Sequence, residues 1–381
     1  MHQISKAIRK CLVVSCVLFL FSTSVQSENY QIEQIASGLG IPWGMTFYSE
    51  NEILFSERQG RLGILNLGNG KVVYLSGLPK ILAKGQGGLM DVVKAPANSI
   101  NKWTYFTYVK PIDDKGNGET TIARAHVTSE GVQDWQDLLV TQSHFGAIFD
   151  VIGVAWGSDR HFGSRIAFDD THLYFSIGDR GNRPNGQKLK SHAGSILRLN
   201  IDGSVPQDNP FVDVEGARNE IWSYGHRNPQ GLVWDSVKQR LWSIEHGPRG
   251  GDELNLIKRG GNYGWPIISY GKEYASFRSV GEGTHKEGME QPKKFYIPSI
   301  APGSLMQYTG GAFPEWQGDL FAGSLKLRHI NRIELDQEGN EIAEERLMED
   351  LNERIRALLQ SPEGWIYFST DSGNIYVIKP S

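Results

Sequence analysis

The sequence predicts an all-β fold, and within that class a six-bladed β-propeller. Two observations carry this prediction. The 381 residues include 44 Gly, 10 Trp, 14 Tyr and 16 Phe, and many short apolar runs are separated by glycine-bearing turns, as in turn-rich β-proteins. The second observation is a unit that recurs along the chain: an apolar strand, a turn, a strand of aromatic and β-branched residues, a glycine-bearing turn and a third strand.

Six copies of this unit align by eye, at residues 42–66, 87–109, 164–181, 229–251, 318–335 and 356–380. Their central strands lie near Leu54, Tyr105, Tyr174, Leu241, Leu320 and Tyr367. A sheet this short cannot bury both faces alone, so neighbouring copies must stack, and radial stacking of four-stranded sheets gives a propeller. A β-sandwich or two small β-domains remain as alternatives, but neither explains six copies of one unit.

Two further elements follow from the propeller interpretation. The ring must close, and an early strand at residues 30–35 is expected to complete the last blade. Helical signal is scarce, and residues 341–351 form the best helix candidate although they lack strong caps. Residues 28–381 show no linker or shift in composition, so they are expected to form one domain.

The first 27 residues are expected to be a secretory signal peptide. Lys6, Arg9 and Lys10 precede an apolar run at 11–21, and Val25 and Ser27 suit a cleavage site. The apolar run is too short to span a membrane, and no later stretch is long enough. A periplasmic location is therefore expected.

Removal of residues 1–27 takes both cysteines and three basic residues, and the formal net charge moves from −4 to −7. A chain without basic excess is not expected to bind nucleic acid generally. Against this acidic background, arginine and lysine gather in the loops that follow strands. These residues are Arg165, Arg180, Arg183, Arg227, Arg249, Lys326, Arg354 and Arg356. Loops at one end of a propeller converge, so the cluster predicts an anionic ligand with several carboxylates or phosphates.

Two loop positions suggest chemistry. His161 is a candidate general base, and Asp179, one repeat step later, is placed to orient it. Glu253 follows Asp252 in a glycine-rich loop whose oxygens would suit Ca²⁺. The mature chain has no Cys for zinc, and it contains no nucleophile elbow, phosphate loop or dinucleotide-binding motif.

Six loop motifs, taken in order, resemble the soluble pyrroloquinoline-quinone-dependent sugar dehydrogenases, above all the bacterial periplasmic aldose sugar dehydrogenases. They read GQGGLMDVV, HFGSRIAF, EIWSYGHRNPQG, EHGPRGGDELN, NYGWP and RIRAL. The resemblance covers nearly the whole mature chain. It implies a six-bladed propeller, in agreement with the repeat count, and a quinone with three carboxylates in the mouth of the channel.

The resemblance also implies residue roles. Cofactor contacts are expected from Gln86, Arg227, Asn228, Tyr274, Ser324, Leu325, Lys326, Arg354, Ile355 and Arg356. The carbonyls of Gly247 and Pro248 would hold a Ca²⁺ ion that also binds the quinone. Glu253 and the carbonyl of Tyr263 match a second Ca²⁺ position.

The implied reaction is oxidation of an aldose to a lactone. His161 would take the proton of the anomeric hydroxyl, hydride would pass to the quinone, and Asp179 would stabilise the charged imidazole. Arg227 and Ca²⁺ would stabilise negative charge on the quinone oxygen. Electrons would leave to an unidentified acceptor, and the chain would act as a monomer or homodimer. The glucose-dehydrogenase branch has an Asp where this chain has Arg160, so strict glucose preference is not expected.

Two other functions stay open at this point. One is a Ca²⁺-dependent lactonase on the same fold, which would need a ring of carboxylate ligands that the arginine cluster disfavours. The other is a binding propeller without enzymatic activity, which the presence of His161, Arg227 and the Arg354/Arg356 pair disfavours.

Overall fold

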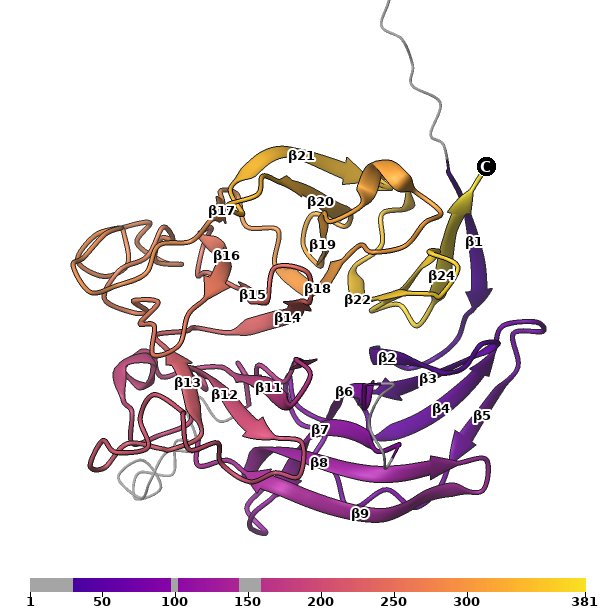
Figure 1. Cartoon of the computed structure of the whole chain (residues 1–381), viewed down its shortest axis with the longest axis horizontal. Helices are drawn as coiled ribbons and strands as arrows, with labels where there is room; N and C mark the ends of the chain where they lie inside the picture. Colours follow the sequence, from indigo (N-terminus) through magenta and orange to yellow (C-terminus); the bar gives the residue numbers. More distant parts are fainter. Residues whose placement is uncertain (1–29, 97–101, 144–158) are drawn as a thin grey trace, which may run out of the picture.

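The computed structural model describes residues 30–96, 102–143 and 159–381. Six four-stranded antiparallel sheets stand around a central axis like the blades of a propeller (Figure 1). This confirms the predicted fold class and blade number. The expected signal peptide at 1–27 lies outside the described residues. In the described part of the chain, no helix combines the length and apolar character needed to cross a membrane.

The blades follow one another along the chain. Blade 1 comprises β2 (Pro42–Ser49), β3 (Glu52–Glu57), β4 (Arg61–Asn66) and β5 (Val72–Leu75). Blade 2 comprises β6 (Leu89–Lys94), β7 (Thr104–Pro111), β8 (Gly118–Thr128) and β9 (Gly131–Val140). Blade 3 comprises β10 (Ile166–Phe168), β11 (His172–Ile177), β12 (Ser195–Asn200) and β13 (Ile221–Tyr224).

The second half of the ring has the same order. Blade 4 comprises β14 (Pro229–Asp235), β15 (Arg240–Glu245), β16 (Asp252–Ile257) and β17 (Lys294–Tyr296). Blade 5 comprises β18 (Pro302–Gln307), β19 (Leu320–Ser324), β20 (Ile330–Leu335) and β21 (Glu341–Leu347). Blade 6 comprises β22 (Ile355–Gln360), β23 (Ile366–Thr370), β24 (Ile375–Pro380) and β1 (Tyr30–Ala36). Short 3₁₀ turns lie at Arg183–Gln187, Pro314–Trp316 and Glu349–Leu351.

The six central strands expected from the sequence are the second strands of the six blades. In β3, Ile53, Leu54 and Phe55 are all fully buried, because neighbouring blades cover both faces of the strand. That explains why these strands appear in the sequence as continuous apolar runs. The fifth copy, 318–335, begins with β19, the second strand of blade 5. The first strand of that blade, β18, precedes the copy.

The ring closes by pairing the two ends of the described chain. β1 lies antiparallel to β24, with Tyr30 opposite Pro380 and Gln34 opposite Tyr376, and the two strands lie side by side in Figure 1. The expectation that residues 30–35 complete the last blade is confirmed.

The prediction of a helix at 341–351 is wrong. Glu341–Leu347 forms β21, which pairs with β20, and only Glu349–Leu351 turns into a short 3₁₀ segment. β21 is the outermost strand of blade 5, and its residues before Leu347 are exposed. Because neither face is buried, the strand lacks the period-two alternation by which it could be recognised.

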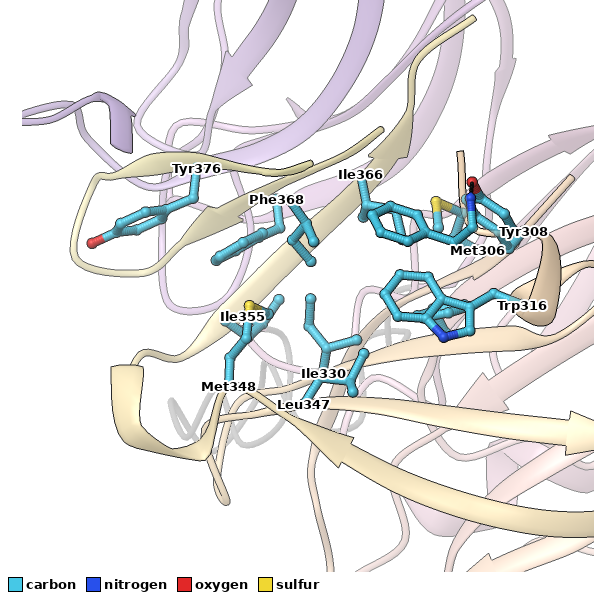
Figure 2. Packing of buried hydrophobic residues seen from close by; sticks show 13 residues of the cluster. Met306, Tyr308, Trp316, Ile330, Leu347, Met348, Ile355, Ile366, Phe368 and Tyr376 are labelled. Atoms are coloured by element: carbon cyan, nitrogen blue, oxygen red, sulfur yellow. Dashed lines mark hydrogen bonds between the residues drawn. The ribbon is translucent and has the colours of Figure 1, made fainter. Parts of the chain in front are cut away.

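Apolar side chains between adjacent blades form the core. Figure 2 shows one such cluster between blades 5 and 6, where Ile355 and Phe368 of blade 6 pack against Ile330 and Leu347 of blade 5. Burial of this kind stabilises the fold by roughly 25 cal/mol per Å² of apolar surface.

One arginine, Arg165, links the blades close to the axis of the ring. It directly precedes β10 and is 6% exposed. Its guanidinium donates hydrogen bonds to the innermost strands of the other five blades, through the carbonyls of Trp43, Gln230, Gly303 and Arg356 and the carboxylate of Asp91. The sequence groups Arg165 with the arginines of an anion site. The structure corrects this, because the five donor groups are already used to join the blades.

Candidate active site

Loops from all six blades meet at one end of the ring, which we call the site face. It carries the N-terminal ends of the inner strands and the turns that join the second and third strand of each blade. A cavity of about 300 Å³ opens there. Its walls are formed by Ile41, Trp43, Arg58, Gln86, Met90, Phe162, Gly163, Asn228, Gln230, His246, Ala301, Leu325, Arg354, Arg356 and Asp371.

His161 and Asp179 come together beside this cavity, as the sequence predicts. The Nδ1 atom of His161 lies 2.6 Å from Oδ1 of Asp179, and the backbone N–H of His161 donates to Oε1 of Gln86 at 2.8 Å. Gly178 permits this approach, since a Cβ there would lie 2.3 Å from the carbonyl oxygen of His161. Among the described residues, the Nε2 atom of His161 has no hydrogen-bond partner, so it is the atom available to a substrate.

Asp179 is itself held from three sides. Trp265 donates its Nε1–H to Oδ2 at 2.8 Å, and the N–H of Gly181 donates to Oδ1 at 2.7 Å. The backbone N–H of Asp179 donates to the carbonyl of Arg227. The carboxylate is therefore fixed in position before any ligand binds, which is the condition for orienting a base.

The two groups titrate in a way that suits a base and its partner. Burial lowers the pKa of His161, and the charge of Arg227 adds to this, so that together they outweigh the bond to Asp179. Burial alone would raise the pKa of Asp179, but the bond and charge of His161 and the charge of Arg227 hold it below its usual range. His161 is therefore neutral and able to accept a proton near neutral pH.

Positive charge dominates the opposite wall of the cavity. Arg354 and Arg356 both bond to Asp371, with their Nε atoms 2.8 Å from its carboxylate oxygens, and Arg354 also donates to the carbonyl of Leu325. Arg58 lies nearby, and burial followed by the charge of Arg356 lowers its pKa. Three guanidinium groups thus lie near a single carboxylate that bonds to two of them, an excess of positive charge that an anionic ligand would relieve.

A second, smaller cavity of about 10 Å³ lies between blade 4 and the long β16–β17 connection, and its size suits a single ion. Glu245 and Glu253 sit opposite each other on β15 and β16 and both line it. Burial, and after it the charge of Glu245, raises the pKa of Glu253 well above its usual range. The side-chain N–H₂ group of Asn255 bonds to both carboxylates, while its buried Oδ1 atom has no hydrogen-bond partner.

The donors around this small cavity fit a hard cation. Gly247 and Tyr263 also line it, so that backbone oxygens and two carboxylates are available together, as Ca²⁺ prefers. Among the described residues, no group of three or more His, Cys, Asp or Glu side chains is suited to a metal. Pro248 lies on the same loop, and its carbonyl accepts a hydrogen bond from Tyr274 at 3.1 Å.

The structure places the remaining predicted cofactor residues at different depths. Gln86, Asn228 and Leu325 line the larger cavity. The side chain of Ser324 bonds to the carbonyl of Ile300 inside its own loop, and the side chain of Ile355 points into the core (Figure 2), so these two residues offer only backbone groups.

Lys326 and Tyr274 lie further out. Lys326 is exposed beside Leu325. Tyr274 is 61% exposed on the β16–β17 connection and is not part of the cavity wall.

The other loop arginines have separate partners. Arg227 donates to the carbonyl of His246 at 3.1 Å and lines the small cavity. Arg180 is fully buried with its guanidinium 3.5 Å from the centre of the Phe162 ring. Arg183 forms a two-pronged bond with Glu273. Only some members of the predicted arginine cluster therefore face a ligand site.

Sequence reasoning missed several residues that shape the site. Asp371 stands in the β23–β24 turn, and its link to Arg354 and Arg356 follows from the pairing of β22 with β23. Glu245 and His246 belong to the motif EHGPRGGDELN, but the sequence alone did not predict a role for either residue. Burial lowers the pKa of His246 to about 3. The signal for Glu245 was its position opposite Glu253 in the adjoining strand.

Comparison with known proteins agrees with this geometry. The family model described as Glucose / Sorbosone dehydrogenase matches residues 39–378. The chain is 34% identical to the aldose sugar dehydrogenase YliI of Escherichia coli, over 100% of both chains. It is 28% identical to the quinoprotein glucose dehydrogenase B of Acinetobacter calcoaceticus, over 92% of this chain and 87% of that protein.

A solved structure extends the likeness to three dimensions. The crystal structure of the soluble aldose sugar dehydrogenase of Escherichia coli in the apo-form has a TM-score of 0.84 and 32% identity, covering 92% of this chain and 100% of that one. The family match spans most of the chain and both cavities. This chain therefore belongs to the glucose/sorbosone dehydrogenase family.

Proposed function

We propose that this protein oxidises the anomeric carbon of aldose sugars to lactones in the periplasm, using pyrroloquinoline quinone together with Ca²⁺. The enzyme class and the use of the quinone follow from membership of the family. The lactone product, the Ca²⁺ requirement, the export and the individual residue roles are the proposal. The observation that carries it is a His161–Asp179 pair at the edge of a cavity lined by Arg58, Arg354 and Arg356.

The larger cavity fits the quinone by charge. Pyrroloquinoline quinone is a flat tricarboxylate, and its carboxylates would meet the guanidinium groups of Arg58, Arg354 and Arg356. Lys326 beside the cavity would add a further positive charge. Gln86 and Asn228 would contact its edge. When bound, the quinone supplies a two-electron acceptor for the hydride from the sugar.

His161 would bind the sugar's anomeric hydroxyl through Nε2 and take its proton as hydride leaves the same carbon. Its neutral state near neutral pH makes this transfer favourable. Asp179 would hold the Nδ1–H tautomer and stabilise the imidazolium once it forms. Arg227, which is 8% exposed and lines the small cavity, would stabilise negative charge that develops on the cofactor side.

The small cavity and the neighbouring loop fit Ca²⁺. Glu253 and the carbonyl of Tyr263 would hold one ion beside Glu245. The carbonyls of Gly247 and Pro248 would hold another at the cofactor. A cation would relieve the repulsion between Glu245 and Glu253. The lactonase alternative is not favoured, because guanidinium groups rather than a ring of carboxylates line the larger cavity.

The test starts from protein that has been purified free of cofactor and is then reconstituted. Quinone and Ca²⁺ are added separately and together, and dye reduction is followed with a panel of aldoses. Turnover is expected only when quinone, Ca²⁺ and sugar are all present, with lactone as the product. Turnover without quinone, or none with any aldose although quinone binds, would overturn the proposal.

A further inference from the structure

The two faces of the propeller carry opposite charge. On the site face, exposed cations occur on loops of several blades; they include Lys80, Lys84, Lys188, Lys326 and Arg328. Exposed carboxylates also occur there, for example Asp114, Asp159 and Asp350, but among the described residues of these loops the cations outnumber them. The site face is therefore basic although the chain as a whole is acidic.

The opposite face carries the turns between the first and second strands and between the third and fourth strands of the blades. Exposed carboxylates dominate its short turns; they include Glu50, Glu130, Asp170, Asp202, Glu338 and Glu363. Lys71 and Lys238 are among the few exposed cations of the described short turns, whereas the long β16–β17 connection carries exposed residues of both signs. The two faces together give the molecule a charge asymmetry along the propeller axis, with its positive end at the site.

Neither the sugar nor the cofactor accounts for the outer cations. An aldose is neutral. A quinone in the cavity touches the cavity wall, which includes Arg58, Arg354 and Arg356 but not Lys84, Lys188 or Arg328. Positive charge spread over the site-face loops of several blades suits a partner with a footprint wider than the cavity.

We propose that the partner which reoxidises the enzyme is an electron-carrier protein with an acidic face, and that it docks on the basic site face. This inference rests on the proposed function. Oxidation of the sugar transfers two electrons to the bound cofactor and releases two protons. Two successive one-electron transfers to two carrier molecules, with both protons released to water, return the enzyme to its starting state.

The geometry favours approach from this side. The cavity opens on the site face. The guanidinium group of Arg165 lies beside the cavity wall, where it bonds to the innermost strands of the other five blades. Opposite charges on two proteins raise association rates by about 10- to 1,000-fold at low ionic strength, and salt removes the effect. The proposal thus predicts rates that depend on the charge of the carrier.

The experiment uses the quinone-loaded holoenzyme and two one-electron carriers of opposite charge, an acidic plastocyanin and a lysine-rich cytochrome c. Stopped-flow mixing measures the rate constant for carrier reduction by enzyme that dithionite has reduced beforehand. The acidic carrier is expected to react at least about tenfold faster at low ionic strength, and to lose most of this advantage at about 0.2 M salt.

Charge reversal then locates the surface. Lys84→Glu combined with Arg328→Glu is expected to slow the acidic carrier at least about fivefold and to leave the reaction with a neutral benzoquinone unchanged. Lys71→Glu combined with Lys238→Glu, on the opposite face, is the matched control and is expected to change neither rate by more than about twofold.

Faster reaction with the lysine-rich carrier, equal rates with both carriers, or no effect of the site-face double variant would overturn the docking proposal. Sugar oxidation with the neutral benzoquinone reports the proposed function alone. A failure of sugar oxidation can be told apart from a failure of docking, because enzyme reduced with dithionite still tests the docking surface.

Discussion

Two histidine–carboxylate pairs in this protein have nearly the same geometry but different surroundings. In the first, Nδ1 of His161 lies 2.6 Å from Asp179, and Nε2 has no partner among the described residues. In the second, Nδ1 of His226 lies 2.8 Å from Glu245, while Nε2 meets the hydroxyl of Ser223 at 2.9 Å. His226 is fully buried and its ring stacks on Tyr263.

The difference shows what turns such a pair into a reactive one. Both carboxylates fix a tautomer and an orientation. Only His161 keeps a nitrogen free at the edge of a cavity. His226 uses both nitrogens inside the protein, and Glu245 also accepts the backbone N–H of Arg227 at 2.7 Å. The second pair therefore supports the loop that carries Arg227 and Asn228, and the first is the pair that we propose for the chemistry.

The largest expected effect comes from His161→Ala. Loss of the base should lower kcat by about 10³-fold or more, because general-base catalysis contributes on the order of 10²–10⁴-fold. Quinone binding, followed by its absorbance, should stay within about twofold, since the guanidinium wall is untouched. An equal loss of turnover and quinone binding would assign His161 to the cofactor instead.

Asp179→Asn should lower kcat by about 10²-fold or more, because the amide can force the wrong tautomer on His161 and cannot stabilise its charged form. Steady-state kinetics should show the loss mainly in kcat rather than KM. His226→Asn is the matched control from the second pair, and its folded fraction should keep a higher kcat than Asp179→Asn. The reverse order would contradict the division of roles.

His226→Ala should act on stability. It removes two buried hydrogen bonds and leaves Glu245 without its histidine partner, at an expected cost of about 2–4 kcal/mol in the free energy of unfolding. Denaturant unfolding of the wild type and His226→Ala measures this, with His161→Ala as the comparison. A smaller loss of stability for His226→Ala than for His161→Ala would show that the buried pair is not the structural one.

The smallest expected effect is a change in pH dependence. Because burial and Arg227 hold the pKa of His161 below its usual value, the acidic limb of kcat/KM should lie at a lower pH than for an ordinary histidine, with activity lost as the pH drops through the lowered pKa. Asp179→Asn removes the bond that favours the charged imidazole, so its residual activity should fall at still lower pH. A shift of the acidic limb of the Asp179→Asn profile to higher pH would contradict the assignment of His161 as the base.

The fold was largely accessible from the sequence because each blade's second strand is covered on both sides. Leu54 and Tyr174 therefore lie in apolar runs that recur at each blade. β21 was missed for the opposite reason: Glu341–Leu347 is an outer strand with an exposed surface, and its charged residues pair with side chains of neighbouring strands, such as Lys294 with Glu341. Those partners are distant in sequence.

The site was accessible in part. The pairing of His161 with Asp179 and the cavity positions of Arg354 and Arg356 agree with sequence-based expectation. The role of Arg165 was not accessible, because a loop arginine that joins six blades has the same local sequence signal as one that binds a ligand. His226 was missed for the same reason, since burial of both its nitrogens depends on Ser223, Glu245 and Tyr263 together.

We propose that His161, and not His226, takes the proton of the aldose hydroxyl while hydride passes from the sugar to the bound cofactor. A single-turnover measurement tests it most directly: enzyme loaded with quinone and Ca²⁺ is mixed with an aldose, and reduction of the bound quinone is followed by absorbance. We expect rapid reduction by the wild type, reduction at a similar rate by folded His226→Ala, and a rate lower by about 10³-fold for His161→Ala with quinone still bound. Reduction by His161→Ala at the rate of the wild type would contradict it.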